Sequence, residues 1–313
     1  MRIRAAAGIS CACALLAIAA PSAWAQLVIG STATGTGTPA AMYIDVNTGT
    51  PTTLWPQTSN TNVNGLAADN VNGKLYANDA ARLNVWNFGS VGTQPTFIAG
   101  IYRTDGAATF VATGVDSLGW ANGHLYGVVS SAASTVGQFR GIYEINTVSD
   151  GMPTPHCVAT PVYQNSFGTM ALGGLDFDPA LGASGKFVVT STVDATSNGG
   201  PGIGIYAIDA LGDDSVVKIA DFPAGQTDWD GLAIGGGKYW LTDYEPGTSA
   251  TIKILPYDPA TNQYGTMFTV ASPDTSNRST GAAWAPSAIP EPSTLALVTL
   301  GSVLLLPRSR RVA

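Results

Sequence analysis

The chain has 313 residues, of which 45% are apolar, only 11% are charged and 37 are glycine. Its 21 acidic residues outnumber its 14 basic ones, which gives a formal net charge of −7. Proteins bind phosphate backbones with clustered Lys and Arg, and residues 26–287 contain no basic stripe, so nucleic acid is excluded as a partner.

Residues 1–25 have the layout of a secretory signal peptide. Arg2 and Arg4 form a basic start, an apolar stretch follows, and Ala23 and Ala25 supply the small residues of a cleavage site. We therefore expect an exported protein whose mature chain begins at Gln26.

The cysteine count fits this expectation. Cys11 and Cys13 lie in the expected signal peptide, so Cys157 is the one cysteine of the mature chain. Without an intrachain disulfide, the fold must depend on its hydrophobic core. Removing the leader and the tail from Ile289 takes away five of the 14 basic residues and one of the 21 acidic residues, which leaves a formal charge of −11.

Residues 229–243, WDGLAIGGGKYWLTD, predict a β-hairpin, because two apolar runs flank a turn of three glycines. Related segments begin at Asn64, Asp116 and Gly173, and a truncated one begins at Thr280. Equivalent apolar positions are separated by 52, 57, 57 and 50 residues; they are Leu66, Leu118, Leu175, Leu232 and Ala282. This spacing is typical of a repeated four-stranded unit.

The remaining strands of each unit recur as well. Third-strand candidates are IYRTD from Ile101, IYEIN from Ile142, IYAID from Ile205 and LPYD from Leu255, and the fourth-strand candidates after them are TFVATG, HCVAT, SVVKIADF and MFTVAS. These short segments are rich in β-branched and aromatic residues and are bounded by turn residues. Sustained helical periodicity is missing from residues 26–287.

The truncated fifth unit indicates how the repeats close. TGAAWAPS, from Thr280, supplies only an inner strand, whereas LVIG, MYIDV and TPTTL near the mature N-terminus match the three missing strands. We therefore predict an all-β fold over residues 26–287, a five-bladed β-propeller whose last blade is completed by N-terminal strands. In such a ring Gln26 and Ala285 leave the same face.

Aspartates recur where first strands begin and second strands end. In a propeller these loops lie together at one face, which would gather Asp79, Asp116, Asp228, Asp230 and Asp243 around the mouth of the channel. The first interpretation is turn chemistry, because Asp and Asn cap turns through nearby backbone N–H groups. The alternatives are a bound cation such as Ca²⁺, which prefers oxygen ligands, and a catalytic site.

We predict no catalytic role for either histidine. His124 follows a turn glycine, at a position where other units carry lysine, so we expect it at a strand edge. His156 precedes Cys157, but neighbouring residues of a strand point to opposite faces and cannot form a nucleophile–base pair. Four tryptophans could stack on sugars or, alternatively, pack between blades; they are Trp120, Trp229, Trp240 and Trp284.

The character of the sequence changes at residues 288–313. Pro290, Glu291 and Pro292 precede an apolar segment from Leu295 to Leu306, and a basic cluster of Arg308, Arg310 and Arg311 follows. The apolar segment is shorter than the roughly 20 residues that span a bilayer comfortably. A short segment with a basic stop indicates a temporary anchor whose arginines lie in the cytoplasm.

Residues 289–311 resemble the PEP-CTERM sorting signal, which has a Pro-Glu-Pro motif, a hydrophobic segment and an arginine cluster in this order. The resemblance implies export by the secretion machinery of a Gram-negative bacterium, transient anchoring at the inner membrane and processing by an exosortase. It also implies a link to exopolysaccharide and biofilm matrix. Pro290, Glu291 and Pro292 would be the recognition element, as substrate residues. Pro307, before the arginines, departs from the pattern.

The sequence therefore predicts an exported, non-enzymatic interaction module at the cell surface or in the matrix, with extracellular polysaccharide as a candidate partner and no catalytic residue. No cofactor is predicted beyond the Ca²⁺ alternative. The second hypothesis is a metal-dependent hydrolase of lactonase type that uses the acidic mouth. Such a site usually includes Glu or His, and the mature body contains only two glutamates, Glu144 and Glu245.

Overall fold

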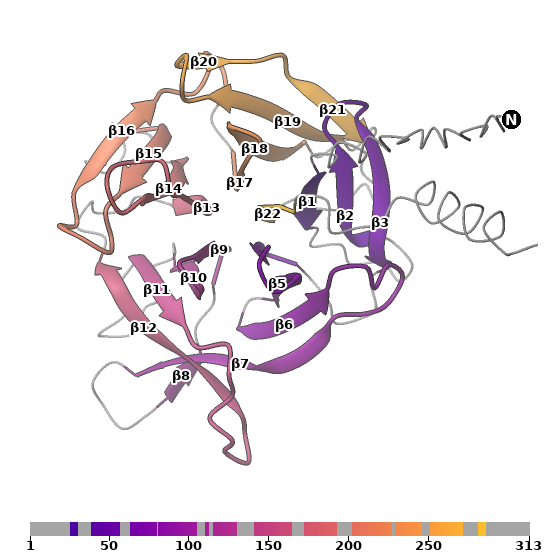
Figure 1. Ribbon diagram of the computed structural model, residues 1–313, viewed down its shortest axis with the longest axis vertical. Coiled ribbons are helices and arrows are strands. Elements are labelled where there is room, and N and C mark those ends of the chain that lie inside the picture. Colours follow the sequence, from indigo (N-terminus) through magenta and orange to yellow (C-terminus); the bar gives the residue numbers. More distant parts are fainter. Residues whose placement is uncertain are drawn as a thin grey trace, which may run out of the picture.

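The computed structural model shows strands joined by turns and loops (Figure 1). It describes residues 26–30, 39–56, 63–79, 81–104, 110–112, 115–129, 141–164, 172–192, 202–226, 229–245, 251–271 and 281–285. Within these ranges there is no helix, and so none that is long and apolar enough to cross a bilayer. The expected signal peptide, residues 1–25, and the expected sorting signal, residues 288–313, lie outside the described residues.

Three of the four sheets are each built around one antiparallel meander. The first contains β22 (Gly281–Trp284), β1 (Gln26–Gly30), β2 (Pro39–Asp45) and β3 (Thr50–Pro56). The second contains β13 (Leu172–Asp178), β14 (Lys186–Ser191), β15 (Gly204–Ile208) and β16 (Val216–Ala220). The third contains β17 (Gly231–Gly235), β18 (Lys238–Glu245), β19 (Thr251–Asp258) and β20 (Gln263–Tyr264), with β21 (Phe268–Ala271) also on β19.

The fourth sheet joins two meanders through their outer strands. One meander contains β4 (Gly65–Asp69), β5 (Lys74–Asp79), β6 (Arg82–Asn87) and β7 (Thr96–Thr104). The other contains β9 (Ser117–Ala121), β10 (His124–Val129), β11 (Gly141–Ile145) and β12 (His156–Gln164). Strands β7 and β12 pair in parallel, and β8 (Phe110–Ala112) pairs with β7.

The strands predicted for the first unit, which begins at Asn64, are wrong in part. IYRTD, from Ile101, was expected to be a third strand, but its first four residues end β7, the fourth strand of the meander. The third strand is β6, and the expected fourth strand contributes only the short β8. The physical reason is that β7 has nine residues and pairs with β6, β8 and β12, so one strand occupies the length expected of two.

The predicted pairing of the N-terminal strands with the last strand is confirmed. Strand β1 pairs with β22 in register from Leu27 opposite Trp284 to Gly30 opposite Gly281. The backbone N–H of Ala285 donates to the carbonyl of Gln26 at 3.1 Å. The two ends of the described chain therefore leave the same end of the strands, as the sequence predicted.

The meanders surround a common axis, and their first strands form its inner wall (Figure 1). Strands β4, β9, β13, β17 and β22 contact one another in a closed cycle. The hydrophobic core is correspondingly divided into clusters that neighbouring meanders share. One contact between meanders is the ring pair Tyr126 and Phe187, with centroids 4.8 Å apart. The body is therefore an all-β fold of propeller type.

Glycine allows the first strands to approach one another closely. A Cβ at Gly281 of β22 would lie 2.7 Å from the Cα of Gly65 in β4. A Cβ at Gly174 of β13 would lie 2.7 Å from the carbonyl carbon of Gly231 in β17. Both distances are shorter than any van der Waals contact, so these positions accept no side chain unless a strand moves.

Two hairpins inside the ring have the backbone that their sequences predict. Asn122 and Gly123, between β9 and β10, have φ values of 52° and 88°, and Gly236 and Gly237, between β17 and β18, have 61° and 74°. Positive φ at both central residues is the type I′ geometry that matches the twist of the flanking strands. The predicted hairpin is thereby confirmed, with Gly236 and Gly237 as its turn and Gly235 as the last residue of β17.

Candidate functional site

A pocket lies on the axis, where the first strands end. Its volume is about 270 Å³, and its lining includes one residue from each first strand or from the turn that follows. These residues are Asn70, Trp120, Asp176, Ile234 and Trp284. We call it the axial pocket. It lies at the same end of the strands as Gln26 and Ala285, because β22 ends at Trp284, beside Gln26.

Asp176 of β13 places a carboxylate in the axial pocket. One carboxylate oxygen accepts the backbone N–H of Ile234 at 2.6 Å, and the other accepts that of Phe177 at 2.8 Å. The first bond satisfies a donor on the inner edge of β17, where no further strand pairs. Burial raises the pKa of Asp176 to about 7, and the nearby Asp178 carboxylate shifts this pKa in the same direction.

The two tryptophans of the axial pocket are held by other aromatic rings. Trp120 stacks on Tyr76 with centroids 5.3 Å apart and an interplanar angle of 9°. Trp284 stacks on Trp240 at 5.7 Å and 11°, and it also lies against Gly235, where a Cβ would collide with its ring. The positions of both indoles are therefore set by packing before any ligand binds.

The four predicted tryptophans thus divide into two pairs. Trp120 and Trp284 line the axial pocket, and Trp284 is also buried in the core cluster that contains Trp240, whereas Trp229 and Trp240 lie in core clusters alone. Asn70 links the turn after β4 to the closing strand β22, because its side-chain amide donates to the carbonyl of Trp284 at 3.1 Å.

Asp176 was not among the residues predicted from the sequence, although the repeat contains a signal for it. The residue that follows the aligned Leu or Ala of each first strand is small in the other units: Ala67, Gly119, Ala233 and Ala283. Asp176 occupies this position in the third unit. The other units carry small apolar residues at this position, so packing of the core does not require a charged residue there.

The predicted aspartates lie at the other end of the strands. The register that pairs Gly231 with Thr242 brings Asp230 and Asp243 to the same end of β17 and β18, and Asp79 ends β5. Burial raises the pKa of Asp79, and Arg82 counteracts part of this shift. Asp116 precedes β9, with its N–H bonded to the carbonyl of Val128 at 2.9 Å.

Asp228 lies outside the described residues. Elsewhere in the described chain, no three His, Cys, Asp or Glu side chains gather in a way that could hold a metal ion. The Ca²⁺ site at the acidic mouth therefore stays a prediction.

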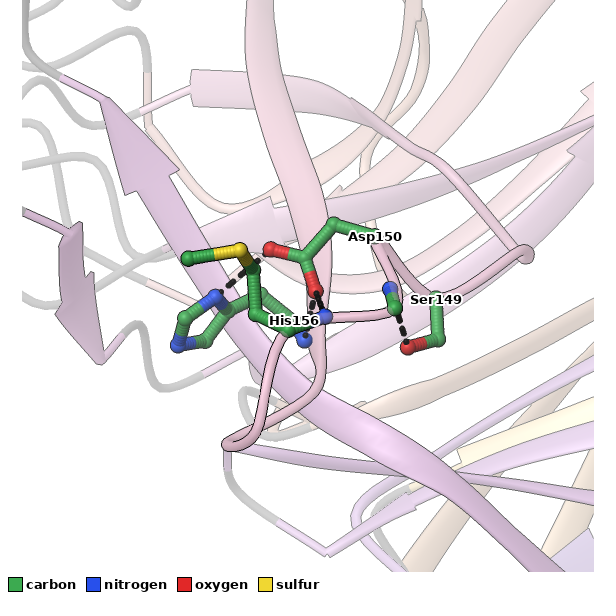
Figure 2. Close-up of polar contacts among 5 residues, drawn as sticks. Ser149, Asp150 and His156 are labelled. Atoms are coloured by element: carbon green, nitrogen blue, oxygen red, sulfur yellow. Dashed lines mark hydrogen bonds and ion pairs between the residues drawn. The ribbon is translucent and has the colours of Figure 1, made fainter.

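His156 is the first residue of β12 and is bonded to Asp150 in the loop before this strand (Figure 2). Nδ1 of His156 lies 2.7 Å from Oδ2 of Asp150, and the backbone N–H of His156 donates to Oδ1 at 3.0 Å. These bonds, together with the Met152 N–H, lower the pKa of Asp150. The hydroxyl of Ser149 accepts the Gly151 N–H at 3.3 Å, so Ser, His and Asp here fix the loop between β11 and β12.

Cys157 is buried in the cluster between the two joined meanders. Burial, with a smaller contribution from the Asp150 charge, raises the pKa of its thiol to about 11. The thiolate is the nucleophilic form, and at neutral pH almost none of this residue is a thiolate. His156 and Cys157 thus have separate environments, His156 beside Asp150 and Cys157 in the core cluster.

His124 is the first residue of β10 and follows the Asn122–Gly123 turn, which confirms its predicted place at a strand edge. Its Nδ1 lies 2.7 Å from a carboxylate oxygen of Glu144, and both side chains are exposed. Such a surface pair contributes little to stability.

No protein-family model matches the chain, and no curated protein is similar to it in sequence. One similar solved structure is a chain of a nidogen/laminin complex, at a TM-score of 0.48 and 13% identity over 84% of this chain and 99% of that one. Another is the periplasmic gluconolactonase PpgL of Pseudomonas aeruginosa, at 0.44 and 11% over 84% and 99%. A third is the Dos1 propeller, at 0.35 and 13% over 76% and 58%. At these TM-scores the similarity supports no statement about the function of this chain.

Proposed function

We propose that this protein is an exported, five-bladed β-propeller that acts as a non-enzymatic binding module at the cell surface or in the extracellular matrix. The blade count is supported by the closed cycle of first strands and by the clusters shared between neighbours. In this interpretation the parallel pair β7–β12 joins two blades at their outer edges.

The binding role rests on the axial pocket. All five first strands or their turns contribute to it, and it combines an acceptor, two indoles and side-chain amides in about 270 Å³. Few polar groups among aromatic surfaces are typical of sites that orient a small ligand. Extracellular polysaccharide is the proposed partner, because indole rings and amides are suited to sugar rings and hydroxyls.

Export and sorting rest on the sequence at the two ends. Residues 1–25 would direct secretion, and Pro290, Glu291 and Pro292 would present the chain to an exosortase at the inner membrane. Four residues, 286–289, separate the described body from this motif. Even fully extended they reach only about 14 Å, so the end of the body that carries the axial pocket would face the membrane until processing.

The sorting proposal is tested in cells with and without an active exosortase. The intact mass and the membrane fraction of the full chain are compared with those of a variant that carries Ala at residues 290–292. We expect the wild type alone to lose mass and leave the inner membrane, and only when the exosortase is active. An unchanged mass and location of the wild type would contradict sorting.

The binding proposal is tested by retention of the purified full-length chain on polysaccharide from the producing cells. We expect Trp120→Ala to reduce retention and Val148→Ala, at an exposed residue outside the axial pocket, to leave it unchanged. Equal retention of the wild type and Trp120→Ala would contradict binding at this pocket.

A metal-dependent hydrolase is the second candidate, because the strand register places Asp230 and Asp243 at one end of neighbouring strands. Metal analysis of the purified chain separates the two candidates. Stoichiometric Ca²⁺ or Zn²⁺ that is lost in Asp230→Asn and Asp116→Asn would favour the hydrolase, and wild-type protein without metal would exclude it.

A further inference from the structure

Asp176 is the one ionisable residue that lines the axial pocket. The other lining residues are apolar, aromatic or amide-bearing, and none is basic. An ionised carboxylate in a desolvated site is costly unless a positive charge or hydrogen bonds compensate for it. Its two backbone N–H bonds supply part of this compensation.

The carboxylate retains the capacity to accept further bonds. Each of its oxygens accepts one N–H, at 2.6 Å and 2.8 Å, and a carboxylate offers about four acceptor positions. Asp176 remains partly exposed at the pocket, so a donor that enters can reach it. A positively charged donor would make the stronger, charge-assisted bond.

The rest of the lining indicates the kind of cation. Indole is the best aromatic partner for an organic cation, and Trp120 and Trp284 both line the pocket. Asn70 and Asn122, exposed at the rim, can bond hydroxyl groups. A calcium ion prefers six to eight oxygen ligands, whereas this lining offers a single carboxylate.

We propose that the axial pocket binds a small polyhydroxylated organic cation, a protonated primary amine about the size of one amino sugar, with its ammonium group on Asp176. This proposal rests on the proposed binding function and names the ligand class of the same site. A volume of about 270 Å³ fits one such molecule and excludes a longer chain from entering as a whole.

Protonation of Asp176 competes with binding of the cation, because both occur at the same carboxylate. The pKa of this carboxyl, raised to about 7 by burial, lets it lose its charge near neutral pH. Asp178, on the same strand, is the charged neighbour that shifts it, and Asp178 is in turn bonded to the Tyr239 hydroxyl of β18 at 2.6 Å. Strands β9, β17 and β22 contribute no charged side chain to the lining.

The experiment is calorimetric titration of the purified full-length chain with glucamine and with its neutral counterpart sorbitol. An aliphatic amine stays protonated from pH 6 to 8, so only the protein changes charge in this range. We expect glucamine to bind at pH 8, about tenfold more weakly at pH 6, and sorbitol to bind at least tenfold more weakly than glucamine.

Asp176→Asn keeps an oxygen for the Ile234 N–H and removes the charge, so we expect a loss of at least tenfold in glucamine affinity. The matched control is Asp258→Asn, at a turn-capping aspartate that accepts the Ala260 N–H at 2.9 Å. Trp120→Leu provides a second test if Asp176→Asn fails to fold, with a weaker affinity expected.

Equal binding of glucamine and sorbitol, or full glucamine affinity in Asp176→Asn, would overturn the proposal. So would Ca²⁺ binding that is lost in Asp176→Asn and that glucamine does not displace. If the wild-type protein is retained on polysaccharide but does not bind glucamine, this inference alone is overturned. If it is neither retained on polysaccharide nor binds glucamine, the proposed binding function is overturned as well.

Discussion

Asp176 occupies a position at which the fold requires only a small residue. Four equivalent positions in the repeat carry Ala or Gly, and the first strands close around them. The carboxylate gains two backbone N–H bonds but is removed from water, and the raised pKa shows that desolvation outweighs these bonds. A residue that disfavours its own charged form is typical of a functional position, although structural networks also shift pKa values.

The stability of the fold should therefore depend on pH. The pKa of Asp176 is about 7 in the fold against an ordinary value of 3.8, so between these values the folded chain holds a proton that the unfolded chain has released. The free energy of unfolding then falls as pH rises from about 4 to about 7, and this contribution is constant above that range. Urea denaturation at pH 5 and pH 8 measures the difference.

Asp176→Asn should reduce that difference, because the titrating group is gone. Asp258→Asn serves as the control and should retain it. An identical pH dependence in wild type and Asp176→Asn would show that other groups produce it.

Cys157 should react slowly with thiol reagents in the folded protein. Its side chain is buried, and its pKa is raised to about 11, so both access and thiolate population are low. We expect the native chain at pH 8 to react with a chromogenic disulfide at least a hundredfold more slowly than the chain in urea. Rapid native labelling at residue 157, identified by mass spectrometry, would contradict this burial.

At the scale of the strand, the repeat predicted which segments line the axis. Leu66, Leu118, Leu175, Leu232 and Ala282 all lie on first strands, as their common spacing indicated. The packing of these strands depends on glycine at their contacts. Their role could not be recognised from one sequence, because glycine is also the usual turn residue.

Gly281→Ala should destabilise the ring. The new Cβ would lie 2.7 Å from the Cα of Gly65 and 2.9 Å from the carbonyl oxygen of Asn64, and both are backbone atoms that cannot rotate away. Overpacking of this kind typically costs about 1 to 3 kcal/mol. Chemical denaturation measures the loss, and Ala271→Val, at an exposed strand residue, should change stability by less than about 0.5 kcal/mol.

Other parts of the strand assignment could not be predicted. IYRTD resembles the third strands of the next two units, and only the parallel pairing of β7 with β12 explains its place in a fourth strand. Long-range pairing of this kind leaves no local pattern in the sequence. The axial pocket was missed for a related reason, because the aspartates were interpreted through turn chemistry and Asp176 lies within a strand.

At the scale of the whole molecule, the ring is closed by pairing between segments about 250 residues apart. The prediction of this closure came from counting strands, since the last unit lacked three and the N-terminus offered three. Closure also brings the two ends of the body together beside the axial pocket. Ligand access and sorting would therefore concern the same face of the protein.

A designed disulfide tests this closure directly. Val28 of β1 lies opposite Ala283 of β22, and both side chains belong to one core cluster. We expect Val28→Cys with Ala283→Cys to form a bond that is visible as a shift between reduced and oxidised gels. Because the bond would close a loop of more than 100 residues, the entropic model gives a gain of up to about 5 kcal/mol, less any strain. Val28→Cys with Ala282→Cys is the matched control, because adjacent strand residues point to opposite faces, and it should stay reduced. If both pairs form equally well, or neither does, then β1 and β22 do not pair in this register.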